Sequence, residues 1–384
     1  MQELIKRVIH SYVAECLRRY PAVAVLGPRQ CGKTTLAKTF SDDYFDLEQQ
    51  ADQLRLDITW ESVTQQRGLT ILDEAQEMPS IFPRIRGAID ADRKRNGRFL
   101  LSGSVSPSLT TQVSESLAGR IALIELSPLS ISEVGHKKMD QLWLTGGYPD
   151  GGIANGSAFP DWQQNYLNLL TQRDLPNWGL PARPSTTQRL MKMLAASHGQ
   201  FWNASQLGKS MGLSAKTVSS YVEFLEGAFL IRRLPPYSAN IKKRLVKSPK
   251  IYWRDTGLLH SLLNISSSTA LLNQPWIGHS WEGFVIEQIS RELTAKGISH
   301  DLYCFRTSDQ YEIDLVIQFG SELWSIEIKL TSNPTQKDFE RLCRASSFIG
   351  ATRSYLISKA SKPALGQQGG LCSLQDFLKE LPPE

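Results

Sequence analysis

The stretch GPRQCGKTT, residues 27–35, places two glycines, a lysine and two hydroxyls directly after the apolar run AVAVL. It fits the pattern G-x-x-x-x-G-K-[ST] without gaps. Glycine lets backbone amides approach phosphate oxygens, and a helix that begins at the lysine points its positive end at the anion. Lys33 would reach the β- and γ-phosphates, and Thr34 would ligate Mg²⁺. We therefore predict a nucleotide-binding loop, the alternative being a glycine turn with an incidental lysine. The predicted nucleotide-binding residues are Gly27, Pro28, Arg29, Gln30, Cys31, Gly32, Lys33, Thr34 and Thr35.

A strand that ends in two acidic residues complements the loop. In LTILDEAQEMP, residues 69–79, an apolar strand precedes Asp73 and Glu74. This is the Walker B pattern, in which Asp73 would hold Mg²⁺ and Glu74 would orient or activate the attacking water. A kinase of small molecules needs no such glutamate, so the pair favours hydrolysis of ATP. The alternative is a buried strand that ends in an acidic turn.

Two further strands supply candidate catalytic residues. RFLLSGSVSPSL, residues 98–109, ends its apolar part near Ser104, which would sense the γ-phosphate; a plain turn is the alternative. Arg120 opens the next apolar strand, in ESLAGRIALIELSPLS, residues 115–130. It would act as an arginine finger, and the alternative is an exposed arginine at a strand edge. With Lys33 and Glu74, these are the predicted catalytic residues of the amino-terminal region.

A second group of chemical side chains lies in the last third of the chain. Helical periodicity in HSWEGFVIEQISRELTAKG, residues 279–297, places Glu282 amid the apolar face and Glu287 away from it. Such a carboxylate is expensive to bury unless it is paired or bound to metal. We predict that it joins Asp314 and Glu327, two carboxylates on neighbouring strands, around Mg²⁺.

The two strands are predicted from period-two alternation. In YEIDLVI, residues 311–317, Glu312 and Asp314 share one face, and in WSIEIKL, residues 324–330, Glu327 and Lys329 share another. FGSE between the strands predicts a hairpin turn. Asp314 and Glu327 would bind the metal, and Lys329 would stabilise or help deprotonate an attacking water. The alternative is an amphipathic hairpin whose cross-strand charges satisfy each other.

The middle of the chain predicts a pair of helices followed by a basic stretch. NASQLGKSMGLSAKTVSSYVEFLEG, residues 203–227, gives two helices with Gly212 in the turn and Ser214 capping the second. The outward residues of the second helix are small and polar or basic, as a helix in a nucleic-acid groove would require. Eight basic residues and no acidic one then follow between 232 and 254, namely Arg232, Arg233, Lys242, Lys243, Arg244, Lys247, Lys250 and Arg254. They predict contact with DNA or RNA phosphates, the alternative being a protein-binding module or a solvated face.

Composition limits the class of protein. The chain has 384 residues, 41% of them hydrophobic and 21% charged, with a formal net charge of +5, so we expect several domains of a globular protein. No run is long and apolar enough for a membrane helix, and the first segment, MQELIKRVIHSYVAECLRRYP, lacks the apolar stretch of a secretory signal, so we expect a structural helix there. The five cysteines are scattered without CxxC spacing, which favours the reducing cytoplasm over a disulfide framework.

Several motifs together resemble a known family. LGPRQCGKTTLAK, ILDEAQ, LLSGS, LAGR, ELSPLS, GGYP and the later WEGFVIEQ, EIDLVI and IEIKL are similar to bacterial and archaeal AAA-type ATP-binding proteins with a conserved C-terminal domain of uncertain function. The resemblance covers almost the whole chain. It implies an AAA-type ATPase core, a winged-helix middle and a C-terminal fold like that of PD-(D/E)xK restriction endonucleases, although Ile313 stands where that motif has proline. AAA relatives often form rings in which an arginine reaches a neighbour's nucleotide, and Arg120 matches that position.

We accordingly expect an α/β protein of four segments. Residues 1–135 would form a P-loop ATPase domain, 136–185 a helical linker, 186–265 a winged-helix domain and 266–384 a nuclease-like α/β domain. One hypothesis is Mg²⁺-dependent ATP hydrolysis coupled to nucleic-acid binding, with metal-dependent cleavage at the far end. The other is an ATP-dependent switch for protein partners with an inert nuclease-like domain. A homo-oligomer is compatible with both.

Overall fold

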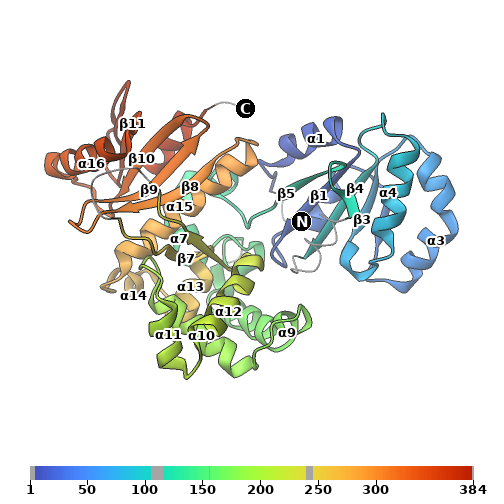
Figure 1. Ribbon diagram of the computed structural model, residues 1–384, viewed down its shortest axis with the longest axis horizontal. Helices are drawn as coiled ribbons and strands as arrows, with labels where there is room; N and C mark the ends of the chain where they lie inside the picture. The colour runs from blue at the N-terminus through green and yellow to red at the C-terminus, as the bar shows by residue number, and fades with distance from the viewer. Residues whose placement is uncertain (1–4, 105–115, 155, 239–244, 383–384) are drawn as a thin grey trace. The chain divides into compact units, whose positions relative to one another are not determined.

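The computed structural model describes residues 5–104, 116–154, 156–238 and 245–382, which form two compact units (Figure 1). The first unit holds the chain up to residue 134 together with 227–229 and 294–296. The second holds residues 135–226, 230–293 and 297–384. Each unit has its own sheet and its own buried core, so each is described by itself.

The first unit is built on a five-stranded, all-parallel sheet with the order β2-β3-β4-β1-β5. Its strands are β1 (Ala22–Gly27), β2 (Tyr44–Asp46), β3 (Thr70–Asp73), β4 (Phe99–Ser104) and β5 (Ile121–Glu125). Its helices include α1 (His10–Arg19), α2 (Lys33–Ala37), α3 (Gln50–Gln65), the 3-10 turn η1 (Ala75–Glu77), α4 (Ile81–Ala91) and α6 (Ile131–Val134). The predicted α/β class with a parallel sheet is confirmed.

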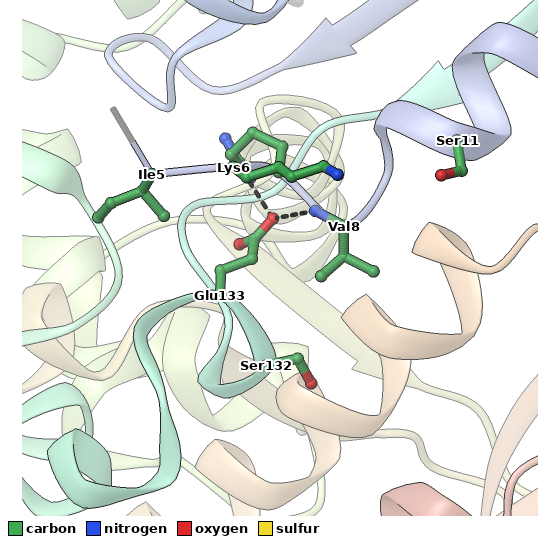
Figure 2. Close-up of a pocket in the computed structure, with 7 residues that line it drawn as sticks. Ile5, Lys6, Val8, Ser11, Ser132 and Glu133 are labelled. Carbon is green, nitrogen blue, oxygen red and sulfur yellow. Dashed lines mark hydrogen bonds and ion pairs between the residues drawn. The ribbon is translucent and has the colours of Figure 1, made fainter. Parts of the chain in front are cut away.

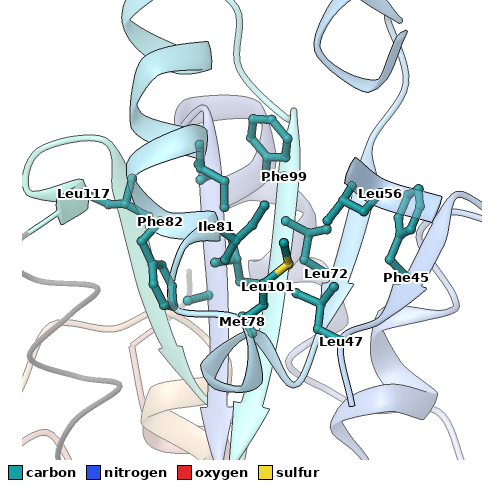
Figure 3. Close-up of a cluster of buried hydrophobic side chains, with 14 of the residues drawn as sticks. Phe45, Leu47, Leu56, Leu72, Met78, Ile81, Phe82, Phe99, Leu101 and Leu117 are labelled. Atoms are coloured by element: carbon teal, nitrogen blue, oxygen red, sulfur yellow. The ribbon is translucent and has the colours of Figure 1, made fainter. Parts of the chain in front are cut away.

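Both faces of this sheet are covered by helices, because the strands are apolar on both sides. Along β1, Ala22, Ala24 and Leu26 face the cluster under α3 and α4, whereas Val23 and Val25 face the cluster under α1 and α2. Figure 3 shows the first cluster, in which side chains from the strands meet those of α3 and α4. Two packed faces fix the strands, and the carboxyl ends of β1, β3 and β4 therefore meet at one edge.

The second unit begins with helices. They are η2 (His136–Lys138), α7 (Met139–Thr145), η3 (Pro149–Gly151), η4 (Gly156–Ala158), α8 (Asp161–Leu169), the π-turn η5 (Leu170–Asp174), α9 (Leu175–Asn177), α10 (Pro184–Ala196), α11 (Ala204–Met211), α12 (Ala215–Gly227), α13 (Thr256–Leu262), α14 (Ser268–Leu272) and α15 (Ile277–Ala295). The predicted pair of helices around Gly212 is present as α11 and α12, and Gly212 takes the left-handed conformation at φ 70°. After α12, β6 (Ile231–Leu234) pairs antiparallel with β7 (Lys250–Trp253).

A six-stranded mixed sheet with the order β12-β13-β11-β10-β9-β8 completes the second unit. Its strands and helices are β8 (Asp301–Arg306), β9 (Glu312–Phe319), β10 (Glu322–Ile328), α16 (Gln336–Ile349), β11 (Arg353–Ile357), β12 (Ala364–Gly366), β13 (Gly369–Cys372) and α17 (Leu374–Glu380). β9 and β10 form the antiparallel hairpin that the alternation predicts. In the part of the chain that the structure describes, no helix is both long and apolar enough to cross a membrane.

Buried ion pairs tie α15 to the strands β6 and β7. Glu287 is 2% exposed and accepts hydrogen bonds from Arg232 and Arg254, with 3.2 Å between Arg254 Nε and Glu287 Oε2. Glu287 was expected to point away from the apolar face of α15. The strands cover that side of the helix as well, so the buried carboxylate needs these charged partners. Burial would raise the pKa of Glu287, but the two guanidinium groups lower it to about 2.

The low pKa of Glu287 predicts acid-sensitive stability of the second unit. An acid whose pKa falls from 4.5 to about 2 on folding stabilises the fold fully above pH ~4.5 and loses that contribution as the pH falls towards 2. The shift corresponds to a contribution on the order of 3 kcal/mol. The difference in unfolding free energy between wild type and Glu287→Gln should therefore shrink as the pH is lowered from about 6 to about 3.

Urea titrations followed by tryptophan fluorescence measure this difference, since Trp60 is the only one of the nine tryptophans in the first unit. The matched control is Glu223→Gln, which removes an exposed carboxylate 3.7 Å from Arg233 and should leave the pH dependence as in wild type. A Glu287→Gln difference that is constant over this range would contradict the assignment.

Candidate nucleotide site and carboxylate pocket

The loop between β1 and α2 packs so closely against neighbouring backbone that there is no room for a side chain at Gly27. A Cβ at Gly27 would lie 2.2 Å from the carbonyl oxygen of Leu126, and Gly32 has φ 97°. Cys31 is fully buried, its thiol donates to Leu126 O at 3.4 Å, and burial raises the pKa of that thiol. Cys31 is thus a packing residue of the loop. Of the remaining predicted loop residues, Pro28 is buried, Arg29 is half-buried, and Gln30 and Thr35 are exposed.

Lys33 is the first residue of α2 and is 6% exposed. Its Nζ donates to Gly27 O at 3.1 Å and to Pro28 O at 2.9 Å. The ammonium therefore lies over the loop, held by the loop's own carbonyls. An ammonium forms stronger hydrogen bonds with an anion than with a neutral carbonyl. A phosphate in the loop would therefore compete with the two carbonyls for the Lys33 ammonium.

The carboxylate of Asp73 joins four segments of the first unit. Its Oδ2 accepts from Thr34 Oγ1 at 2.6 Å and from Tyr44 OH at 2.8 Å. Its Oδ1 accepts from the Ser102 hydroxyl and, at 3.1 Å, from the backbone N–H of Glu74. Burial and the bond to Asp73 raise the pKa of Tyr44. Neither Tyr44 nor Ser102 was predicted as a site residue, because their contacts with Asp73 span about 30 positions of sequence.

The spacing of Thr34 and Asp73 suits a magnesium ion. The Thr34 hydroxyl donates a hydrogen bond to Asp73, so the lone pairs of the Thr34 oxygen remain available to a cation. Hydroxyl and carboxylate oxygens are ligands that Mg²⁺ prefers, and it binds through one or two carboxylates together with substrate phosphates. The residues present therefore fit the predicted cation beside the loop.

Glu74 follows β3 in the left-handed conformation, at φ 49°. Its carboxylate accepts a hydrogen bond from Gln76 Nε2. Burial raises the pKa of Glu48, and the nearby charge of Glu74 adds to that rise. The strained backbone turns Glu74 out of the strand while Asp73 stays within it, so the two acids have different surroundings.

Ser104 and Arg120 lie at opposite ends of the parallel strands. Ser104 is the last residue of β4 and is paired in register with Gly27 at the loop edge. Arg120 precedes β5, at the edge where the strands begin, and donates to Asp90 at 2.9 and 3.1 Å. Strands of five residues span about 17 Å. Arg120 therefore lies too far along the sheet to reach the phosphate loop of its own chain.

Arg7 connects the segment before α1 to the phosphate loop. It donates to Cys31 O at 2.8 Å, to Ser127 O at 2.6 Å and to Glu133 Oε1 at 2.8 Å. Beside these contacts lies a cavity of about 570 Å³, lined by Ile5, Lys6, Arg7, Val8, Ser11, Ser132 and Glu133 (Figure 2). Figure 2 shows the Glu133 carboxylate turned towards the backbone of Val8. Glu133 Oε1 accepts a hydrogen bond from Val8 N at 3.0 Å. The cavity thus shares Arg7 with the phosphate loop.

The second unit brings the predicted carboxylates to one open cavity of about 360 Å³. Its lining includes Glu282, Glu312, Asp314, Glu327 and Lys329. Lys329 Nζ pairs with Glu327 at 2.8 Å, and Asp314 accepts the backbone N–H of Ile328 at 2.9 Å. The Lys329–Glu327 ion pair joins two residues of the same segment, and the cross-strand bond to Asp314 comes from a backbone N–H, so neither contact is a charge pair across the hairpin.

A residue that we did not predict for this pocket lies among the carboxylates. Lys250 Nζ is 2.8 Å from Glu282 Oε1, 2.8 Å from Glu312 Oε1 and 3.5 Å from Asp314 Oδ1. Among the described residues, no group of three His, Cys, Asp or Glu side chains is placed to hold a metal ion. Glu282, Asp314 and Glu327 therefore do not fit the predicted Mg²⁺ in this arrangement, because an ammonium already pairs with two of them.

Half of the eight basic residues are engaged within the protein. Arg232 and Arg254 pair with Glu287, Arg233 pairs with Glu226, and Lys250 pairs with the carboxylate pocket. Lys247 is exposed, and Lys242, Lys243 and Arg244 lie outside the described residues. At least four of the eight charges are thus neutralised by internal partners.

Comparisons with known proteins place the chain in a family. Residues 19–135 match an AAA domain, residues 136–269 a domain of unknown function (DUF8612), and residues 277–374 another domain of unknown function (DUF4143). Uncharacterized proteins of Mycobacterium tuberculosis and Mycobacterium bovis are each 40% identical over 335 residues, covering 86% of this chain and 75% of theirs. The chain belongs to the same family as these two proteins.

Within this family member, the AAA domain includes the phosphate loop, Asp73, Glu74 and Arg120. The predicted AAA-type core is thereby confirmed, and the winged-helix and nuclease-like assignments stay predictions. Among solved structures, the Walker-type ATPase of Pyrococcus abyssi is similar over 68% of this chain and 96% of its own, with a TM-score of 0.48 and 14% identity.

The contact between Gly27 and Leu126 gives a test of the loop. Gly27→Ala would place a methyl group 2.2 Å from Leu126 O, so the loop must shift and nucleotide affinity should fall at least about 10-fold, equivalent to ~1.4 kcal/mol. Fluorescent nucleotide titration measures the affinity. Gly87→Ala in α4, where a Cβ meets nothing within 4 Å, is the matched control and should bind as wild type does. Equal affinities for both variants would contradict a functional role of this close approach.

Proposed function

We propose that the first unit binds ATP with Mg²⁺ and hydrolyses it. The observation that carries the proposal is the 2.6 Å bond between Thr34 Oγ1 and Asp73 Oδ2, beside a loop whose ammonium is already in place. The loop amides and Lys33 would bind the phosphates, and Thr34 and Asp73 would hold the cation. When bound, the cation would offset charge on the transferred phosphoryl group.

Glu74 and a serine of β4 would act on the water and the γ-phosphate. Glu74 lies next to Asp73 but is turned out of the strand, and we assign its carboxylate the task of orienting a water. Ser104, at the loop edge of β4, is the proposed γ-phosphate sensor. Ser102, two residues earlier, instead fixes Asp73 through its hydroxyl. The two serines would therefore have separate tasks.

Two variants separate binding from hydrolysis. Lys33→Ala should abolish nucleotide binding, because it removes the ammonium that faces the phosphates. Glu74→Gln should bind ATP within a factor of about two of wild type and lose at least about 100-fold in turnover, since only the group that orients the water changes. Equilibrium binding and phosphate release measure the two effects. Glu77→Gln, in the same turn, is the control and should retain turnover; undiminished hydrolysis by Glu74→Gln would exclude the proposed role.

Arg120 would serve a neighbouring chain. It lies at the sheet edge away from its own loop and is anchored by Asp90, so a nucleotide that it reaches must belong to another copy. Turnover per chain should then fall on dilution. Mixing Arg120→Ala with Glu74→Gln should restore part of the activity, because each supplies what the other lacks, and an inactive mixture would rule out sharing.

The second unit would couple ATP turnover to a partner, for which we propose nucleic acid. The supporting observation is the helix–turn–helix of α11 and α12, in which Asn203 and Ser214 cap the helices and Lys216 is exposed on α12. The internal pairing of Arg232, Arg233 and Arg254 favours the second candidate, a protein partner. Cleavage is not included, because Lys250 occupies the pocket on which it would depend.

Fluorescence anisotropy with short DNA and RNA duplexes distinguishes the two candidates. A nucleic-acid partner predicts binding that weakens with salt and that Lys216→Ala reduces by about 3- to 10-fold. Lys337→Ala, an exposed lysine of α16, is the control. Binding that is absent, or equal for both variants, would favour the protein partner.

A further inference from the structure

Lys250 is a buried cation at the centre of the carboxylate pocket. It begins β7, is 2% exposed, and contacts carboxylates from two elements that are distant in sequence, Glu282 of α15 and Glu312 and Asp314 of β9. A buried lysine costs several kcal/mol unless its charge is paired and hydrogen-bonded. The two 2.8 Å contacts and the third at 3.5 Å meet that requirement.

The strand β7 directs two successive inward side chains at the same carboxylate. Lys250 and Tyr252 lie two residues apart and therefore on one face of β7. The Tyr252 hydroxyl donates to Glu282 Oε1, and the ring of Phe201 lies 5.8 Å from the Lys250 ammonium. Tyr252 is fully buried, so neither side chain of this pair has room to turn to solvent. The ammonium is held in place by the packing of β7 as well as by charge.

The charges of the pocket follow from this position. Burial alone would raise the pKa of Glu282, but the Lys250 charge and the hydrogen bonds from Lys250 and Tyr252 lower it to about 2. Burial and repulsion by Glu327 and Glu282 raise the pKa of Asp314. Glu282 is thus a carboxylate matched to an ammonium, whereas Asp314 retains its proton more readily than an exposed aspartate.

We infer that the Lys250 ammonium takes the place of a divalent cation in this pocket and keeps such a cation out. Mg²⁺ binds carboxylate oxygens at about 2.0–2.1 Å in near-octahedral geometry. A cation that bound Glu282 and Asp314 would lie within a few ångströms of Lys250 Nζ, and two positive charges at that distance repel strongly in a buried site. The pocket is therefore stabilised by an internal counter-ion and is not a metal-dependent hydrolytic centre.

The inference predicts that removal of one lysine creates a metal site. In the full-length protein without nucleotide, Lys250→Met should bind one more Mn²⁺ per chain than wild type, because methionine keeps the volume and removes the charge. Any Mn²⁺ held near Thr34 and Asp73 is common to both proteins and cancels in the difference. Electron paramagnetic resonance of free Mn²⁺ measures the occupancy. Lys329→Met is the matched control, since Lys329 is 40% exposed and pairs with Glu327, and it should gain no site.

The wild-type protein provides a second test that does not depend on the folding of Lys250→Met. Wild type and Glu282→Gln should bind Mn²⁺ equally, because the ammonium already excludes it. A wild-type Mn²⁺ site that Glu282→Gln abolishes would overturn the inference, as would a folded Lys250→Met that gains none. If Lys250→Met folds only when Mn²⁺ is present, as circular dichroism would show, the metal has replaced the ammonium and the inference is supported. ATP turnover belongs to the other unit, so its loss or retention does not affect this result.

Discussion

The carboxylate of Asp73 is the constraint on which the first unit depends. It is 2% exposed and accepts from the hydroxyls of Thr34, Tyr44 and Ser102 and from the backbone of Glu74. These donors come from α2, β2, β4 and the turn after β3, so one side chain sets the spacing of the loop edge. A buried carboxylate is tolerated only when its lone pairs are filled, and here each oxygen has two donors. The same oxygens are the ones that a cation beside the phosphate loop would use.

Much of this edge could be predicted from sequence because its parts are local. The loop, Lys33 and Thr34 are contiguous, and a parallel sheet must bring the ends of β1 and β3 to one edge. Tyr44, Ser102 and Arg7 could not be predicted in the same way, since their roles arise from contacts across the fold. The serine of β4 illustrates the difference. Both serines belong to the polar end of one predicted strand, and the sequence alone does not tell that Ser102 meets Asp73.

The second unit shows how formal charge differs from available charge. Eight basic residues in 23 positions suggest a surface for polyanions, yet several of them pair with acids elsewhere in the sequence. Glu226, Glu282 and Glu287 lie outside the stretch, so a count within it finds no acid. The alternation of Lys250 and Tyr252 was the available sign of burial. A lysine two residues before a tyrosine in KIYW, between apolar neighbours, indicates one inward face of a short strand.

The contacts of Arg7 and Gly27 have a consequence for protein engineering. The phosphate loop touches Leu126 through Gly27 and is joined by Arg7 to Ser127 and Glu133. Two stretches within the first 35 residues and a third about a hundred positions further along the chain therefore form one structural unit. A chimera that exchanges residues 27–35 alone would leave mismatched neighbours, whereas a graft that also carries the segments around 7 and 126–133 would preserve the joint.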